Sequence, residues 1–182
     1  MFMHRNHSVK MHYLVDLVGF KQSSNNYILK EFSFVSAEDD LVDPLVLLFK
    51  PPFPWRRLSE RYQKINSWLK FHHHGLEWNS GKFPYQGIKN ILYECLHSAT
   101  KVLVDSEIKK EWLKRFGFEV ENIFDYSYST FKKPKQVSIC LNHDATCKIN
   151  CALHNVTFLK KFYKQNFDEM NYEDFEIISY FE

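Results

Sequence analysis

Short apolar runs and partial alternation of apolar with polar residues indicate β-strands in the first half of the chain. The apolar run at residues 13–20 ends at a polar turn, and residues 27–35 then alternate in part between apolar and polar positions. This pattern predicts an antiparallel hairpin. A third strand is expected over residues 44–49, because the three prolines of the next segment, residues 51–55, cannot donate ladder hydrogen bonds.

The second half of the chain alternates between the helical period and short apolar strands. Helices are predicted over residues 59–71, 85–99, 105–115 and 151–165, and buried strands over residues 101–104 and 120–124. Three antiparallel strands followed by alternating helices and strands are typical of the RNase H-like fold. The expected fold class is therefore α/β, with a mixed sheet of three antiparallel strands plus parallel strands and with flanking helices.

Composition limits the class of protein. The 182 residues suffice for one domain, and 45% hydrophobic with 25% charged residues is ordinary for a globular chain. No apolar run is long enough to span a membrane, and the N-terminus lacks a signal-peptide core. A cytoplasmic or nuclear protein is expected, with thiols free or metal-bound. The net charge of +2 gives no overall electrostatic signature of nucleic-acid binding.

Three cysteines and a histidine gather near the C-terminus and carry the strongest candidate chemistry. Cys140 and His143 are separated by two residues, so one turn of chain can bring both to a single ion, and Cys147 and Cys151 follow. Thiolate and imidazole are preferred zinc ligands. The set is incomplete as a local motif, so a further ligand has to come from elsewhere; the alternative is small buried thiols beside a surface histidine.

Several segments, taken in order, resemble the Maelstrom domain, a divergent relative of the DEDDh 3′–5′ exonucleases. They are residues 30–35, residues 47–52, residues 74–76, the Cys140-x-x-His143 pair, and the Cys-Ala-Leu at residues 151–153 that opens a helix. The resemblance implies an N-terminal extension at residues 1–11 and a Maelstrom-like domain at 12–167. Residues 168–182 would then form an acidic, aromatic tail.

The resemblance also implies a ligand set for structural zinc. By position these ligands are Glu31, Cys140, His143 and Cys151, with Cys147 as a spare thiol or as the replacement for Cys151. Four protein ligands leave no open coordination position, which is typical of structural rather than catalytic zinc.

The exonuclease centre looks degenerate. DEDDh enzymes hold two metal ions with four carboxylates. Here Asp16 stands at the first position, but its partner position is Val18, and the final motif reads Asn-Cys-Ala-Leu-His-Asn over residues 150–155. Asp105 and Asp125 are candidates for the second Asp of the motif by order along the chain only. A two-metal exonuclease is therefore not expected.

Two basic segments are candidates for contact with nucleic acid. Trp55, Arg56 and Arg57 join a stacking ring to two guanidinium groups, and Lys132, Lys133 and Lys135 precede the cysteine cluster. Alternatively, Trp55 packs on the core and the arginines are simply solvated. His72, His73 and His74 suggest a second metal site or a pH-sensitive surface, although neighbouring residues on a loop usually point apart.

The function implied by the resemblance is association with single-stranded RNA in small-RNA (piRNA-type) transposon silencing, with endoribonuclease cleavage of single-stranded RNA as the implied activity if the protein is an enzyme. A catalytically dead protein-interaction module is the alternative, favoured by the near-neutral charge and by the 17% of aromatic residues. An active metal-dependent nuclease is the weaker alternative.

Overall fold

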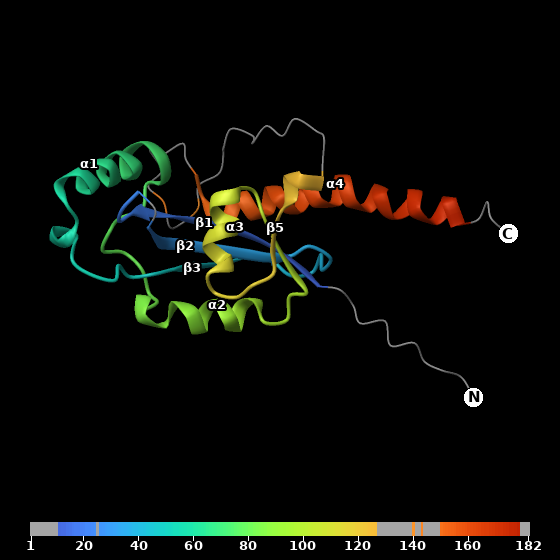
Figure 1. Ribbon diagram of the computed structural model, residues 1–182, viewed down its shortest axis with the longest axis horizontal. Helices are drawn as coiled ribbons and strands as arrows, with labels where there is room; N and C mark the ends of the chain where they lie inside the picture. Colours follow the sequence, from blue (N-terminus) through green and yellow to red (C-terminus); the bar gives the residue numbers. More distant parts are fainter. Residues whose placement is uncertain (1–10, 25, 127–139, 141–142, 144–149, 179–182) are drawn as a thin grey trace.

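A five-stranded mixed sheet forms the centre of the molecule (Figure 1). The computed structural model describes residues 11–24, 26–126, 140, 143 and 150–178, with side chains up to residue 166. The strand order is β3-β2-β1-β4-β5. β2 runs antiparallel to β1 and β3, whereas β4 is parallel to both β1 and β5. The predicted α/β class, with three antiparallel strands plus parallel strands, is confirmed. The strands are β1 His12–Lys21, β2 Tyr27–Ser36, β3 Leu45–Leu48, β4 Lys101–Val104 and β5 Val120–Asn122.

Helices flank the sheet on both faces. α2 (Ile88–Leu96) and α3 (Glu107–Lys114) pack their apolar sides on one face, and α4 (Ala152–Ile178) packs on the other. α1 (Glu60–Leu69) lies at one end of the sheet and continues into a π-helical turn, Lys70–His74. Among the described residues, no helix is both long and apolar enough to cross a membrane.

The fourth helix extends beyond its predicted end. It was expected to end near residue 165, but α4 continues to Ile178 and so crosses the predicted boundary between the domain and the tail at residue 167. Residues 166–178 contain neither proline nor glycine, so nothing in the local sequence breaks the helix. The predicted last strand is shorter than expected, because a 3₁₀ turn begins at Ile123.

A β-bulge at Lys30 sets which side chains of β2 face α4. Val18 pairs with Glu31, whereas its neighbour Gly19 pairs with Leu29, so Lys30 is the extra residue of β2. Its side chain is fully buried, and its ammonium donates to the backbone carbonyls of Phe49, Trp78 and Ser80. The bulge leaves Glu31 on the face of the sheet that α4 covers.

Asn66 attaches α1 to the end of β1, and its replacement should destabilise the protein. This buried side chain accepts a hydrogen bond from the Lys21 N–H at 2.8 Å and donates one to the Lys21 carbonyl at 2.7 Å. Asn66→Ala should lower the free energy of unfolding by about 2 kcal/mol or more, because both backbone groups lose their partner. Urea unfolding measures this; a change below about 0.5 kcal/mol, the usual range for surface substitutions, would contradict it.

Candidate metal centre

Four side chains from distant parts of the chain converge beside the N-terminus of α4. They are Glu31 from β2, Cys140 and His143 from the preceding segment, and Cys151 just before the helix, and their potential ligand atoms all lie within 4.8 Å of one another. The four residues are those that the resemblance implied. Cys147, the alternative ligand, lies outside the described residues.

Local backbone structure explains how these side chains meet. The His143 N–H donates to the Cys140 carbonyl at 3.1 Å, so the two residues belong to one turn, as their spacing predicted. Glu31 is fully buried, and its carboxylate accepts a hydrogen bond from the backbone N–H of Ala152 at 2.9 Å. Ala152 is the first residue of α4, where free N–H groups and the helix dipole favour a negative charge.

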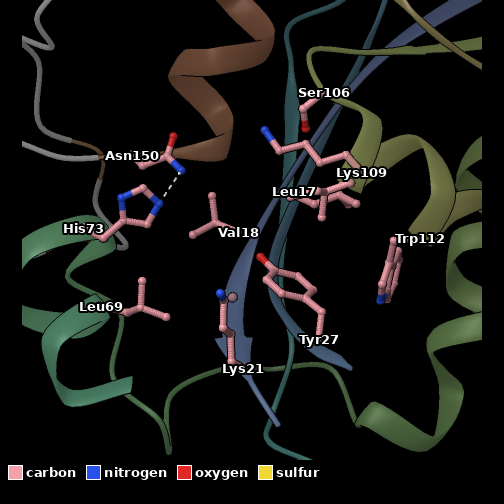
Figure 2. Close-up of a pocket in the computed structure, with 12 residues that line it drawn as sticks. Leu17, Val18, Lys21, Tyr27, Leu69, His73, Ser106, Lys109, Trp112 and Asn150 are labelled. Atoms are coloured by element: carbon pink, nitrogen blue, oxygen red, sulfur yellow. Dashed lines mark hydrogen bonds between the residues drawn. The ribbon is translucent and has the colours of Figure 1, made fainter. Parts of the chain in front are cut away.

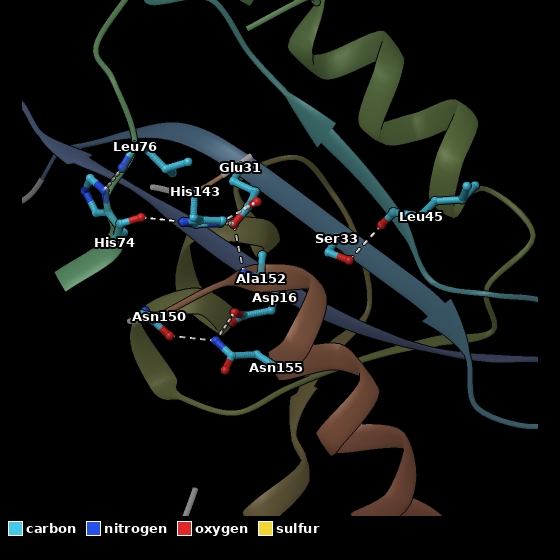
Figure 3. A network of polar contacts seen from close by, with 10 residues as sticks. All are labelled: Asp16, Glu31, Ser33, Leu45, His74, Leu76, His143, Asn150, Ala152 and Asn155. Atoms are coloured by element: carbon cyan, nitrogen blue, oxygen red, sulfur yellow. Dashed lines mark hydrogen bonds and ion pairs between the residues drawn. The ribbon is translucent and has the colours of Figure 1, made fainter. Parts of the chain in front are cut away.

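The orientation of His143 suits metal binding. Its Nδ1–H donates to the backbone carbonyl of His74, and its Nε2 faces the Glu31 carboxylate at 2.9 and 3.1 Å (Figure 3). A histidine that binds a metal usually donates its second ring N–H to a carbonyl or carboxylate, which fixes the tautomer and the ring. His143 therefore has one nitrogen held by the backbone and the other directed into the cluster.

The electrostatics of the cluster favour a bound cation. Burial alone would lower the pKa of His143, but the hydrogen bond and the charge of Glu31 outweigh it and raise that pKa. Burial, with the Glu31 charge added, raises the pKa of the Cys151 thiol strongly. A thiolate at this position thus needs nearby positive charge, which a divalent ion supplies.

Apolar packing closes the site on the sheet side. Val18, Leu76 and Ala152 form a buried cluster next to it, and Leu48 packs against them. Two thiols, an imidazole and a carboxylate make up a complete tetrahedral set for zinc, so the residues fit a four-coordinate structural ion. Bound zinc would hold Cys140, His143 and the start of α4 to β2.

A second cluster, centred on Asp16, lies under the same helix. Asp16 is fully buried, accepts a hydrogen bond from the Asn155 side chain, and pairs with the Lys109 ammonium (Figure 3 shows the first contact). The Lys109 Nζ also lies 2.6 Å from Oδ1 of Asp105. Two carboxylates thus converge, but the position between them is filled by a lysine ammonium, and an amide stands on α4 where an acid was missing from the motif.

A cavity of about 230 Å³ adjoins Lys109. Leu69 and His73 line one side, and Lys109 and Trp112 of α3 line the other, with Tyr27 between them (Figure 2). None of the four residues of the metal centre lines this cavity. The metal centre is thus distinct from this cavity, although Val18 borders both.

The predicted nucleic-acid residues have mixed placements. Trp55 packs partly buried, with its ring centroid 6.4 Å from that of Phe20 and 5.2 Å from that of Trp78. Its ring packs at the edge of the core, whereas Arg56 and Arg57 are exposed. The other three residues predicted for this role lie outside the described part of the chain: Lys132, Lys133 and Lys135.

Sequence reasoning missed the roles of Lys109 and His74. Lys109, in the first turn of α3, follows Asp105 just before the helix by four residues, a spacing typical of an ion pair that could have indicated it. His74 contributes its backbone carbonyl to His143, and its buried ring accepts a hydrogen bond from the Leu76 N–H. Burial lowers the pKa of His74 to about 3. No sequence signal marks a backbone contact of this kind.

The assignment of the metal centre rests on its geometry and not on similarity to known proteins. Neither a scan against protein-family models nor a search of curated proteins finds a match to this chain.

Proposed function

We propose that this protein is a zinc-stabilised, RNase H-like, Maelstrom-like factor that binds single-stranded RNA and has no two-metal exonuclease activity. The observation that carries the proposal is the convergence of Glu31, Cys140, His143 and Cys151, since that ligand set is the one the family resemblance implies. Zinc is the proposed ion because two thiolates and an imidazole favour it over the oxygen-seeking Mg²⁺ and Ca²⁺.

The sheet topology supports the RNase H-like part of the proposal. Among the five strands that the structure describes, only β2 runs opposite to the others, and the crossover from β3 through α1 and α2 places β4 beside β1. This is the combination of an antiparallel hairpin and helix-fed parallel strands that the resemblance implies.

The Asp16 cluster supports the absence of exonuclease chemistry. Two-metal hydrolysis needs several carboxylates whose charge is available to divalent ions. Here the charge of Asp16 is paired with the Lys109 ammonium, and Asn155 supplies a neutral amide. A small-RNA silencing role follows from the proposed family alone.

Local charge supports binding to RNA. Residues 55–74 contain five basic residues and one acidic residue, so this segment is more positive than the whole chain with its net charge of +2. The near-neutral total therefore hides a basic segment, and positive segments with aromatic rings suit single-stranded nucleic acid.

A mobility-shift assay tests the proposal directly. The protein should retard a labelled single-stranded RNA, and binding should weaken by several-fold between about 50 and 200 mM salt because phosphate contacts release counterions. The RNA should remain intact in Mg²⁺ or Mn²⁺. Absence of any shift would favour the protein-interaction alternative, and metal-dependent cleavage that Asp16→Asn abolishes would favour an active nuclease.

A further inference from the structure

The outward side of α1 and of the π-helical turn that follows it carries exposed aromatic and basic residues in one row. Five exposed residues follow one another at spacings of three, four, three and one positions along the chain. They are Arg61, Lys64, Trp68, Phe71 and His72. The inward side, by contrast, holds the buried Asn66. We call these five residues the α1 stripe.

The rings of the α1 stripe are available to a ligand. The side chains of Trp68 and Phe71 are 57% and 65% exposed, which is unusual for large aromatic groups. The Trp68 and His72 ring centroids lie 5.4 Å apart, with planes tilted by 37°. The Lys70 ammonium lies 5.1 Å from the centre of the Phe71 ring. Bases stack on such rings whatever their sequence.

The positive charge of the α1 stripe indicates the kind of partner that it could bind. Arg61 and Lys64 stand on the same row as the rings, and Arg56 and Arg57 are exposed just before α1. Glu60 is the only acid of residues 55–74. Positive side chains interleaved with exposed rings match a polyanion that carries flat, unpaired bases.

We propose that the α1 stripe is a binding surface for single-stranded nucleic acid, with bases stacked on Trp68 and Phe71 and phosphates held by Arg61 and Lys64. The proposal rests on the proposed function and replaces Trp55 as the stacking residue, since Trp55 is packed against Phe20 and Trp78. The stripe reaches the π-helical turn whose His73 borders the cavity beside Lys109.

Fluorescence anisotropy with a labelled oligouridylate of about 16 nucleotides tests the stripe. Trp68→Ala with Phe71→Ala should weaken binding at least about tenfold, because each stacked base contributes roughly a five- to 150-fold change. Arg61→Gln with Lys64→Gln should reduce the slope of log K against log salt by about 1.4, or about 0.7 for each lost phosphate contact.

The matched control is on α2. Tyr93 is 60% exposed, and its ring centroid lies 5.9 Å from that of His97. Lys89 is exposed on the same helix. Tyr93→Ala with Lys89→Gln should bind like the wild type. Circular dichroism checks that every variant is folded.

The outcomes separate this inference from the proposed function. If the wild type binds RNA and both stripe variants bind equally well, the stripe is not the surface and the inference is overturned, while RNA binding stands. If the wild type does not bind, the proposed function fails together with the inference. A DNA strand of matched length that loses affinity in the same variants supports stacking chemistry. A duplex bound as tightly as the single strand contradicts it, because paired bases have no free face.

Discussion

Cys151→Ser should abolish stoichiometric zinc binding and lower the melting temperature by about 8–16 °C. The expected size follows from linkage, since an ion at 1,000 times its dissociation constant stabilises the folded state by about 4 kcal/mol. For a chain of this length, 1 kcal/mol corresponds to about 2–4 °C. Metal content by mass spectrometry and a thermal melt followed by circular dichroism measure the two effects.

Cys95→Ala is the matched control for this experiment. Cys95 lies on α2, on the opposite face of the sheet from α4, and is only partly buried. Its replacement should leave about one zinc per chain. A chelator separates loss of metal from loss of packing: it should lower the melting temperature of the wild type and leave that of Cys151→Ser unchanged. Purified wild type with well under half an equivalent of zinc, or a chelator without effect, would refute the structural zinc site.

Lys109→Met should destabilise the protein by about 3–5 kcal/mol, because it removes the ammonium that faces two carboxylates. Asp16 is fully buried and the Asp105 side chain is only 5% exposed, so solvent screens their charges poorly. Denaturant unfolding gives the free energy. Adding Asp16→Asn to Lys109→Met should recover part of the loss, because it removes one of the two neighbouring negative charges.

Lys114→Met is the control for the lysine substitution. Lys114 stands on the same helix, and its pair with Glu111 at 3.6 Å is largely exposed, so its loss should change stability very little. Equal stabilities for the Lys109 and Lys114 variants would show that the Asp16 cluster contributes no structural ion pair.

The Lys109 cluster also has a defined pH dependence. Burial lowers the pKa of Lys109, but Asp16 and Asp105 outweigh burial and raise it above its usual 10.5. A raised pKa in the folded state means that the stabilisation is complete below about pH 10.5 and is lost as the pH rises through the higher folded value. Wild type should therefore lose more stability in this alkaline range than Lys109→Met.

The sequence was sufficient to predict the strands and helices, because apolar runs bounded by polar turns mark the strands and a helical period of apolar residues marks the helices. The hairpin of β1 and β2 and the short strand β4 appear within a residue or two of their predicted bounds. The predicted end of α4 was wrong, because the absence of helix breakers after residue 165 outweighed the acidic composition of that segment. Periodicity describes which face of an element is buried and says little about where a uniform helix ends.

The metal centre could be predicted from the sequence only in part. The turn of Cys140 and His143 follows from spacing, whereas the choice of Glu31 depended on family resemblance, because no local pattern links residues 112 positions apart. The Lys109 pairing with Asp16 was missed for the same reason: the two residues are 93 positions apart, and the parallel pairing of β4 with the first residues of β1 brings them together. The α1 stripe is a third case, since helical period separates inner from outer residues without indicating a ligand.

The wide separation of the metal ligands along the chain has a consequence for how the protein is made. Glu31 leaves the ribosome long before His143 and Cys151, so β1 to β4 have time to pair before the ion can be bound with its full set of ligands. Closing so long a loop is costly in entropy and is most readily achieved on a sheet that already exists. Binding of the proposed zinc ion should therefore come late in folding, after the sheet has formed.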